Sequence, residues 1–123
     1  MRSRNLMDSF RHAFAGLGYA LRTQRNTRIH LSIAVGVILL GIWLSLTTTQ
    51  WAILALTIGM VLVSEMLNTV AETIVDLISP GYHPLAKVIK DVTAGAVLLT
   101  AIFSVAVGLL VLGPPLWERL FGG

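Results

Sequence analysis

Apolar positions divide the chain into one short amphipathic segment and three long apolar segments. From Met7 to about Arg25, apolar side chains recur at alternating steps of three and four, which marks one face of a helix. Basic and polar side chains accompany this face, and such helices tend to lie in the membrane interface. The alternative to an interfacial helix is a helix of the kind found in soluble proteins, packed on a partner. We predict an interfacial helix region at residues 1–28.

The three apolar segments are each long enough to cross a hydrocarbon core of about 30 Å as a helix. They cover residues 29–46, 51–78 and 85–112. A polar turn at 47–50 separates the first two, and a loop at 79–84 with two prolines and a glycine separates the last two. Gly113-Pro114-Pro115 is expected to stop the last helix. The prediction is an all-α membrane protein forming a single domain over residues 1–123.

Composition agrees with this prediction, because 55% of the 123 residues are hydrophobic and only 12% are charged. The chain has no cysteine, which excludes disulfides, thiolate metal sites and a cysteine nucleophile. Residues 31–64 and 92–117 carry no formal charge, and positive charge gathers at the N-terminus and around residues 79–91. Positive residues favour the cytoplasmic side, so the N-terminus and this loop are expected to be cytoplasmic.

The second apolar segment ends in a stripe of polar side chains. Glu65, Asn68, Glu72 and Asp76 are spaced i, i+3, i+7 and i+11, which places them on one face of a helix. Glu65 lies about 21 Å along that helix, so the stripe begins inside the bilayer. An acidic side chain at the bilayer centre costs roughly 2.5–3.5 kcal/mol. The stripe therefore indicates a site that holds a cation or moves a proton.

A cationic pair opens the third apolar segment. Lys87, Lys90, Asp91 and Ala94 again share one helix face, and two ammonium groups beside a carboxylate suit phosphate oxygens with a counter-ion. The alternative is that both lysines only anchor a membrane helix at the cytoplasmic surface. Together with the acidic stripe and a divalent cation, they describe a phosphoryl-transfer site.

Other catalytic patterns are missing from the sequence. Gly16-Leu-Gly18 lacks the lysine and the spacing of a phosphate-binding loop. The histidines, His12, His30 and His83, are too scattered for a zinc site. We interpret each as a polar interfacial residue, although His83 in the cytoplasmic loop is placed to reach a nucleotide.

These motifs together resemble the small bacterial integral-membrane diacylglycerol and undecaprenol kinases. The resemblance covers about Ser9 to Leu112. It rests on the run from Glu65 to Asp76, on Pro80-Gly-Tyr-His83 and on Lys90-Asp-Val-Thr-Ala-Gly-Ala-Val97. The sequence from Ser79 to Lys87 resembles the undecaprenol kinase branch more than the enterobacterial diacylglycerol kinase branch.

The resemblance implies a homotrimer in the bacterial inner membrane, with cytoplasmic sites shared between subunits. Such a kinase transfers the γ-phosphate of MgATP to a lipid hydroxyl, of undecaprenol or of diacylglycerol. By position in the motif, Glu65 would be the general base and Glu72 a Mg²⁺ ligand. The nucleotide site would comprise Asn68, Gly81, Tyr82, His83, Lys90 and Asp91.

One position departs from the family pattern. Gln24 stands where the family commonly has a glutamate that serves as a second magnesium ligand. A glutamine carbonyl still coordinates magnesium but brings no negative charge. Either metal binding depends on Glu72 and the ATP phosphates, or this chain is a catalytically weakened family member.

Two other classes of function compete with a lipid kinase. A small ion- or proton-coupled transporter would also keep carboxylates in the membrane, but it would place them near the midplane. A non-catalytic membrane scaffold would use the stripe for contacts between subunits. We expect no nucleic-acid partner for any of these functions.

Overall fold

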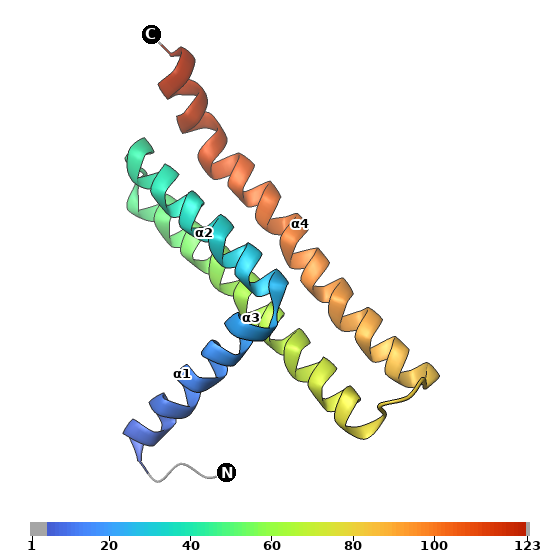
Figure 1. Ribbon diagram of the computed structural model, residues 1–123. Coiled ribbons are helices and arrows are strands. Elements are labelled where there is room, and N and C mark those ends of the chain that lie inside the picture. The colour runs from blue at the N-terminus through green and yellow to red at the C-terminus, as the bar shows by residue number, and fades with distance from the viewer. Residues whose placement is uncertain (1–4, 123) are drawn as a thin grey trace.

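The computed structural model describes residues 5–122, and within them it is entirely helical outside the connecting turns. The helices are α1 (Leu6–Thr23), α2 (Arg25–Leu44), α3 (Thr48–Ile78) and α4 (Pro84–Phe121). Figure 1 shows α2, α3 and α4 running alongside one another, whereas α1 projects at an angle from the start of α2. The all-α prediction is confirmed.

The joint between α1 and α2 lies at one extended residue. Gln24 has φ −112° and ψ 110°, so α1 ends at Thr23 and a new helix begins at Arg25. Arg28 Nη1 donates hydrogen bonds to the carbonyl oxygens of Leu21 at 2.8 Å and Arg22 at 3.1 Å. These bonds satisfy carbonyls that the end of α1 leaves without helical partners. Residues 25–28, predicted as part of the interfacial region, therefore belong to α2; residues 1–4 of that region lie outside the described residues.

The connection between α2 and α3 is shorter than the sequence suggested. Ser45 ends α2 in the left-handed region at φ 55°. Thr47 then caps α3, because its hydroxyl accepts from the Gln50 backbone N–H at 3.2 Å and its own N–H donates to Gln50 Oε1 at 2.9 Å. This reciprocal capping box recruits residues 48–50 into the first turn of α3. The predicted polar turn at 47–50 is corrected accordingly.

Small side chains on α2 allow close packing against its neighbours. The buried residues Thr27, Ala34 and Gly41 recur every seven positions and so lie along one line of the helix. At Gly41 the packing is tightest, since an added Cβ would lie 2.7 Å from a ring carbon of Trp51 on α3. Small residues of this kind let membrane helices approach closely.

Gly41→Ala is expected to lower the free energy of unfolding by about 1–3 kcal/mol, because the new methyl group overpacks the α2–α3 contact. Gly36→Ala is the matched control on the same helix, as its Cβ would have no neighbour within 4 Å. Unfolding of both variants in mixed micelles, followed by circular dichroism, measures the difference. Equal stabilities for the two variants would contradict the close contact at Gly41.

The most extensive contact in the fold joins α3 to α4. At its centre, the Ser64 and Thr100 hydroxyls lie 2.9 Å apart in a hydrogen bond. Closer to the 79–83 connection, Lys90 of α4 reaches Asp76 of α3. The two helices therefore hold the polar end of α3 against the charged start of α4.

α4 extends past the point where the prolines were expected to stop it. It continues through Pro114 and Pro115 to Phe121, although each proline removes a backbone donor. Tertiary contacts beyond the prolines explain this. Leu116 packs on the buried cluster that includes Leu44 and Leu112, and Arg119 lies 4.6 Å from the centre of the Trp43 ring. The predicted end of the helix at residue 112 was wrong because these contacts outweigh the lost hydrogen bonds.

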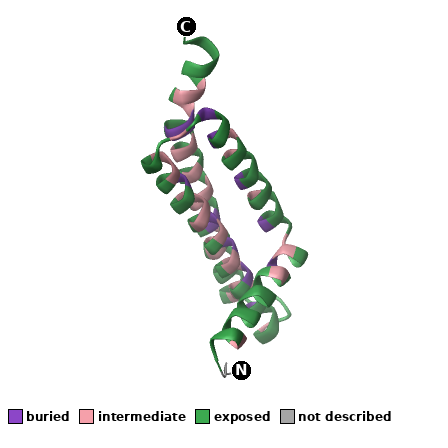
Figure 2. Ribbon diagram, turned by 90° about the vertical axis from the view of Figure 1, so that its left-hand side faces the viewer, coloured by how far each residue is buried: buried purple, intermediate pink, exposed green. Residues whose placement is uncertain are grey.

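Most of the surface is apolar and exposed. In Figure 2 the buried positions are few and most of the ribbon is exposed. Many of the exposed residues are large and apolar, such as Leu77, Leu110 and Phe121. α2, α3 and α4 are each long and apolar enough to cross a membrane. The prediction of three membrane helices agrees with these lengths, and the exposed apolar surface suits a multi-pass membrane protein.

Candidate active site

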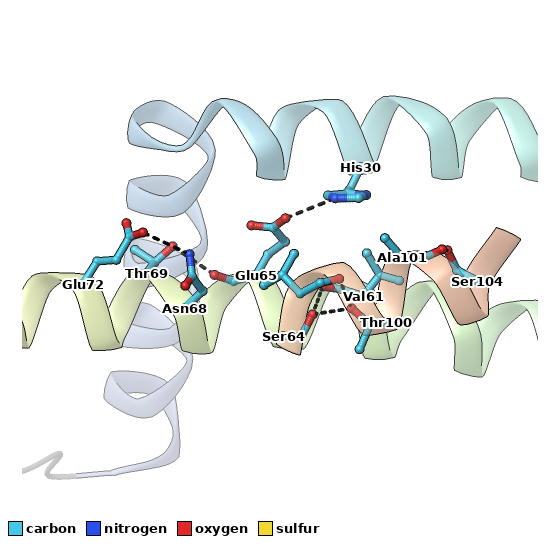
Figure 3. Close-up of polar contacts among 11 residues, drawn as sticks. His30, Val61, Ser64, Glu65, Asn68, Thr69, Glu72, Thr100, Ala101 and Ser104 are labelled. Carbon is cyan, nitrogen blue, oxygen red and sulfur yellow. Dashed lines mark hydrogen bonds and ion pairs between the residues drawn. The ribbon is translucent and has the colours of Figure 1, made fainter. Parts of the chain in front are cut away.

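The polar stripe occupies the half of α3 that leads to the 79–83 connection. Glu65, Asn68 and Glu72 project from this helix in Figure 3, with Glu65 directed toward α2. Asn68 Nδ2 donates to Glu72 Oε1 at 3.4 Å, which confirms that these side chains share a helix face. Helical spacing alone aligned the stripe, as the sequence predicted.

Glu65 is the most deeply buried charged residue of the described chain, with 2% of its surface exposed. Its Oε1 lies 3.1 Å from Nε2 of His30, and the two side chains point toward each other across the space between α2 and α3 (Figure 3). The distance is that of an ion pair, but within residues 5–122 no group meets the angle of a hydrogen bond to this oxygen. A buried carboxylate therefore depends on one imidazole.

Two further buried oxygens at this end of the α2–α3 contact lack hydrogen-bond partners among the described residues. They are Thr27 Oγ1 and Asn68 Oδ1. Buried polar atoms require a partner, which is a water molecule or a ligand where the protein supplies none. Asn68 Oδ1, beside the Glu72 carboxylate, is thus an oxygen donor available to a hard cation or a nucleotide.

The lysines at the start of α4 have different partners. Lys90 Nζ lies 2.8 Å from Asp76 Oδ1 on α3, so this ammonium group is directed at the acidic stripe. Lys87 Nζ lies 2.6 Å from Asp91 Oδ2, one turn further along its own helix. Lys87, Lys90, Asp91 and Ala94 were predicted to share one helix face, but of the two lysines only Lys90 reaches α3. Lys87 and Asp91 form an exposed pair on α4.

The loop before α4 is open to its surroundings. Gly81, Tyr82 and His83 are all exposed, with Tyr82 at 82%. His83 Nδ1 accepts a hydrogen bond from the Leu85 backbone N–H at 3.1 Å and so caps the start of α4. This contact gives His83 a structural role that the sequence did not indicate.

The described residues contain no group of three histidine or acidic side chains arranged to hold a metal ion. Gln24 is half-buried at the α1–α2 joint. The donors nonetheless fit magnesium, which takes one or two carboxylates and completes its shell with phosphate oxygens and water. Glu72 supplies a carboxylate and Asn68 Oδ1 lacks a hydrogen-bond partner within residues 5–122.

Two apolar grooves adjoin the site. The first, of about 300 Å³, lies between α1 and α3 and is lined by Gly16, Tyr19, Ala20, Met66, Thr69, Val70, Thr73 and Ile74. The second, of about 330 Å³, runs between α2, α3 and α4 and includes His30, Ala34 and Val61 among its lining residues. Both are almost entirely apolar, which suits hydrocarbon rather than a soluble ligand.

Comparison with known proteins identifies the family. Residues 11–112 match the family model described as prokaryotic diacylglycerol kinase. The chain belongs to the prokaryotic diacylglycerol kinase family. The resemblance found in the sequence is confirmed.

Relatives within the prokaryotic diacylglycerol kinase family carry two names. A diacylglycerol kinase from Synechocystis is 51% identical over 113 residues, which cover 91% of this chain but only 65% of that protein. An undecaprenol kinase from Bacillus subtilis is 43% identical over 108 residues, covering 88% of each chain. The family and both names indicate a lipid kinase. They do not favour a transporter or a scaffold.

The partner of Glu65 is not evident from the sequence. His30 is predicted there to be a polar interfacial residue, whereas the structure places its ring against the buried carboxylate. A signal was available: His30 lies on the α2 segment that also carries the buried, small residues Thr27 and Ala34. Their seven-residue spacing marks the inner face of α2, and His30 lies one turn from each.

Proposed function

We propose that this chain is a lipid kinase that transfers the γ-phosphate of ATP to a membrane lipid hydroxyl, either undecaprenol or diacylglycerol. The observation that carries the proposal is the buried Glu65 carboxylate at the head of a stripe that Lys90 faces from α4. Membership of the prokaryotic diacylglycerol kinase family supports the same chemistry. Phosphoryl transfer requires a proton acceptor and a positive charge near the phosphates, and Glu65 and Lys90 are proposed to supply them.

The orientation follows from charge. Arg11, Arg22, Arg25 and Arg28 precede or open the first membrane helix, and Lys87 and Lys90 open the last. Positive residues near membrane helices favour the cytoplasmic side. We therefore infer a bacterial inner-membrane protein with its N-terminus and active site in the cytoplasm, where ATP is available, and with α1 lying in the interface.

In the proposed reaction the Glu65 carboxylate accepts the proton of the lipid hydroxyl. The hydroxyl oxygen forms a bond to the γ-phosphorus, the bond from that phosphorus to its bridging oxygen breaks, and ADP leaves with the electron pair. Lys90 neutralises negative charge on the phosphates. Asn68, Gly81, Tyr82, His83 and Asp91 are proposed to line the nucleotide site.

Glu72 would hold magnesium, with the Gln24 carbonyl as a second ligand. When bound, this ion supplies positive charge that neutralises the ATP phosphates. Because Gln24 is uncharged, the metal would be held mainly by Glu72 and by the nucleotide phosphates.

The lipid is proposed to enter beside α1. The groove between α1 and α3 is lined by Thr69, whose hydroxyl donates to the Glu65 carbonyl oxygen at 3.0 Å. A hydrocarbon chain in this groove would bring an interfacial hydroxyl to the neighbourhood of Glu65. Diacylglycerol and undecaprenol both present a primary hydroxyl on a long apolar body, so both are candidates.

The active form is proposed to be a homotrimer with sites shared between subunits. A single chain leaves Tyr82 and the 79–83 connection exposed, and most of the outer surface of α4 is uncovered. Three helices are also too thin to enclose both a lipid and a nucleotide. Sedimentation equilibrium in detergent measures the subunit number, and a monomer with full activity would refute this part of the proposal.

Transfer of radiolabel from MgATP in mixed micelles tests the function. The purified protein is offered undecaprenol and diacylglycerol separately, with Glu65→Gln as the control. Label in one lipid and none in the Glu65→Gln reaction would establish the kinase and its substrate. Label in neither lipid, for a protein shown to be folded, would refute the proposed activity.

Gln24→Glu is expected to lower the magnesium concentration that gives half-maximal activity. A glutamate adds the negative charge that the glutamine carbonyl lacks, so the ion binds more tightly. Activity is measured at fixed ATP across a magnesium titration, with Gln50→Glu as the control at the opposite end of the membrane helices. An unchanged magnesium curve for Gln24→Glu would remove this residue from the metal site.

A further inference from the structure

The Glu65 carboxylate approaches one basic side chain in the described structure, and that side chain comes from a different helix. His30 Nε2 of α2 lies 3.1 Å from Glu65 Oε1 of α3. The exposed fractions of the two side chains are 22% and 3%, so water screens the contact weakly. The lysines at the start of α4 pair with Asp76 and Asp91 instead.

We propose that His30 is a positioning residue that holds the Glu65 carboxylate in its reactive orientation. The proposal rests on the proposed function, in which Glu65 takes the proton of the lipid hydroxyl. His30 supplies the basic group that the described structure places within ion-pair distance of the Glu65 carboxylate. A glutamate side chain has three rotatable bonds, so the loss of its one contact frees it to leave the reactive geometry.

His30 has a second feature that shapes the test. The His30 side chain lines the apolar groove between α2, α3 and α4, and Glu65 does not line this groove. The imidazole therefore stands between the groove and the carboxylate. A substitution that removes the whole side chain would alter both the groove wall and the Glu65 contact. A useful variant must keep the bulk while changing only the ability to donate.

Two substitutions separate these effects. His30→Leu keeps an apolar wall of similar size but removes the donor. His30→Gln keeps an N–H donor, because the terminal amide nitrogen of glutamine reaches about as far as Nε2 of histidine. His12→Leu is the matched control, as His12 is exposed on α1 and has no partner in the proposed site. The assay is radiolabel transfer to the lipid, with kcat and KM for MgATP determined for each folded variant.

We expect His30→Leu to lower kcat by about 10²-fold with little change in the KM for MgATP, because misplacing a catalytic group by about 1 Å has an effect of that size. His30→Gln should stay within about 10-fold of the unsubstituted protein, and His12→Leu should be unaffected. In the Glu65→Gln background, His30→Leu should cause no further loss, since the two residues act as one unit.

A purely structural role would give other results. Equal losses in His30→Leu and His30→Gln, or losses that multiply with that of Glu65→Gln, would overturn the proposal. If His30→Leu does not fold, His30→Asn replaces it, because the shorter asparagine amide does not reach Glu65. Activity in His30→Gln but not in His30→Asn then supports the proposal, and equal activity refutes it. Failure of the unsubstituted protein to phosphorylate either lipid would instead refute the proposed function.

Discussion

Glu65→Gln is expected to lower the kcat for lipid phosphorylation by about 10²–10⁴-fold while MgATP still binds. The substitution keeps the shape of the side chain but removes its capacity to accept the hydroxyl proton. Because Glu65 is buried and directed at His30, no other carboxylate of α3 takes its place. Radiolabel transfer measures turnover, and binding of a fluorescent ATP analogue measures the nucleotide site.

The control for this substitution is Glu118→Gln. Glu118 lies in the exposed extension of α4 beyond the prolines, at the end of the helix far from the stripe. Loss of a carboxylate there should leave both turnover and nucleotide binding unchanged. Near-normal activity of Glu65→Gln would show that another group takes the proton. Loss of nucleotide binding would show that Glu65 organises the site rather than serving as its base.

Lys90→Gln is expected to lower kcat by about 10²–10³-fold, the usual effect of removing one group that stabilises developing charge. The Lys90 ammonium group is held 2.8 Å from Asp76, which directs it from α4 toward the stripe on α3. The KM for MgATP should also rise if, as proposed, the ammonium group contacts the phosphates before the reaction. Loss of stability does not explain such an effect, since exposed ion pairs contribute little to folding.

Lys87→Gln is a close control for Lys90→Gln. The two lysines lie on the same helix three positions apart, but Lys87 pairs with Asp91 of α4 itself. If Lys90 acts through its position, Lys87→Gln should retain most of the activity. Equal losses in the two variants would mean that both lysines act through general positive charge at the membrane surface.

The arrangement explains how a membrane helix tolerates three carboxylates. Asp76 is paired with Lys90, Glu72 contacts the Asn68 amide, and Glu65 contacts His30. Each partner lowers the cost of placing a carboxylate near hydrocarbon. The partners come from α2, α3 and α4, so the stripe also connects these three helices on the side of the 79–83 connection.

The sequence by itself determined the helical content, the three membrane segments and the polar stripe. These features depend on local spacing, since apolar length defines a span and steps of three and four define a face. The motifs between Glu65 and Val97 were also enough to place the chain in its family. Local signals were less reliable at helix ends: the capping box at Thr47 moved the start of α3, and contacts of Leu116 and Arg119 carried α4 past two prolines.

Only the tertiary structure decided which side chains from different helices meet. The sequence placed Lys87 and Lys90 on one helix face. Where α4 approaches α3, however, Lys90 pairs with Asp76, whereas Lys87 pairs with Asp91 of its own helix. From the sequence, His30 is an isolated interfacial residue. In the structure, the packing of α2 on α3 places its ring next to the Glu65 carboxylate. Helical periodicity fixes positions within one helix, whereas contacts between helices depend on the register set by packing, and small residues such as Gly41 control that packing.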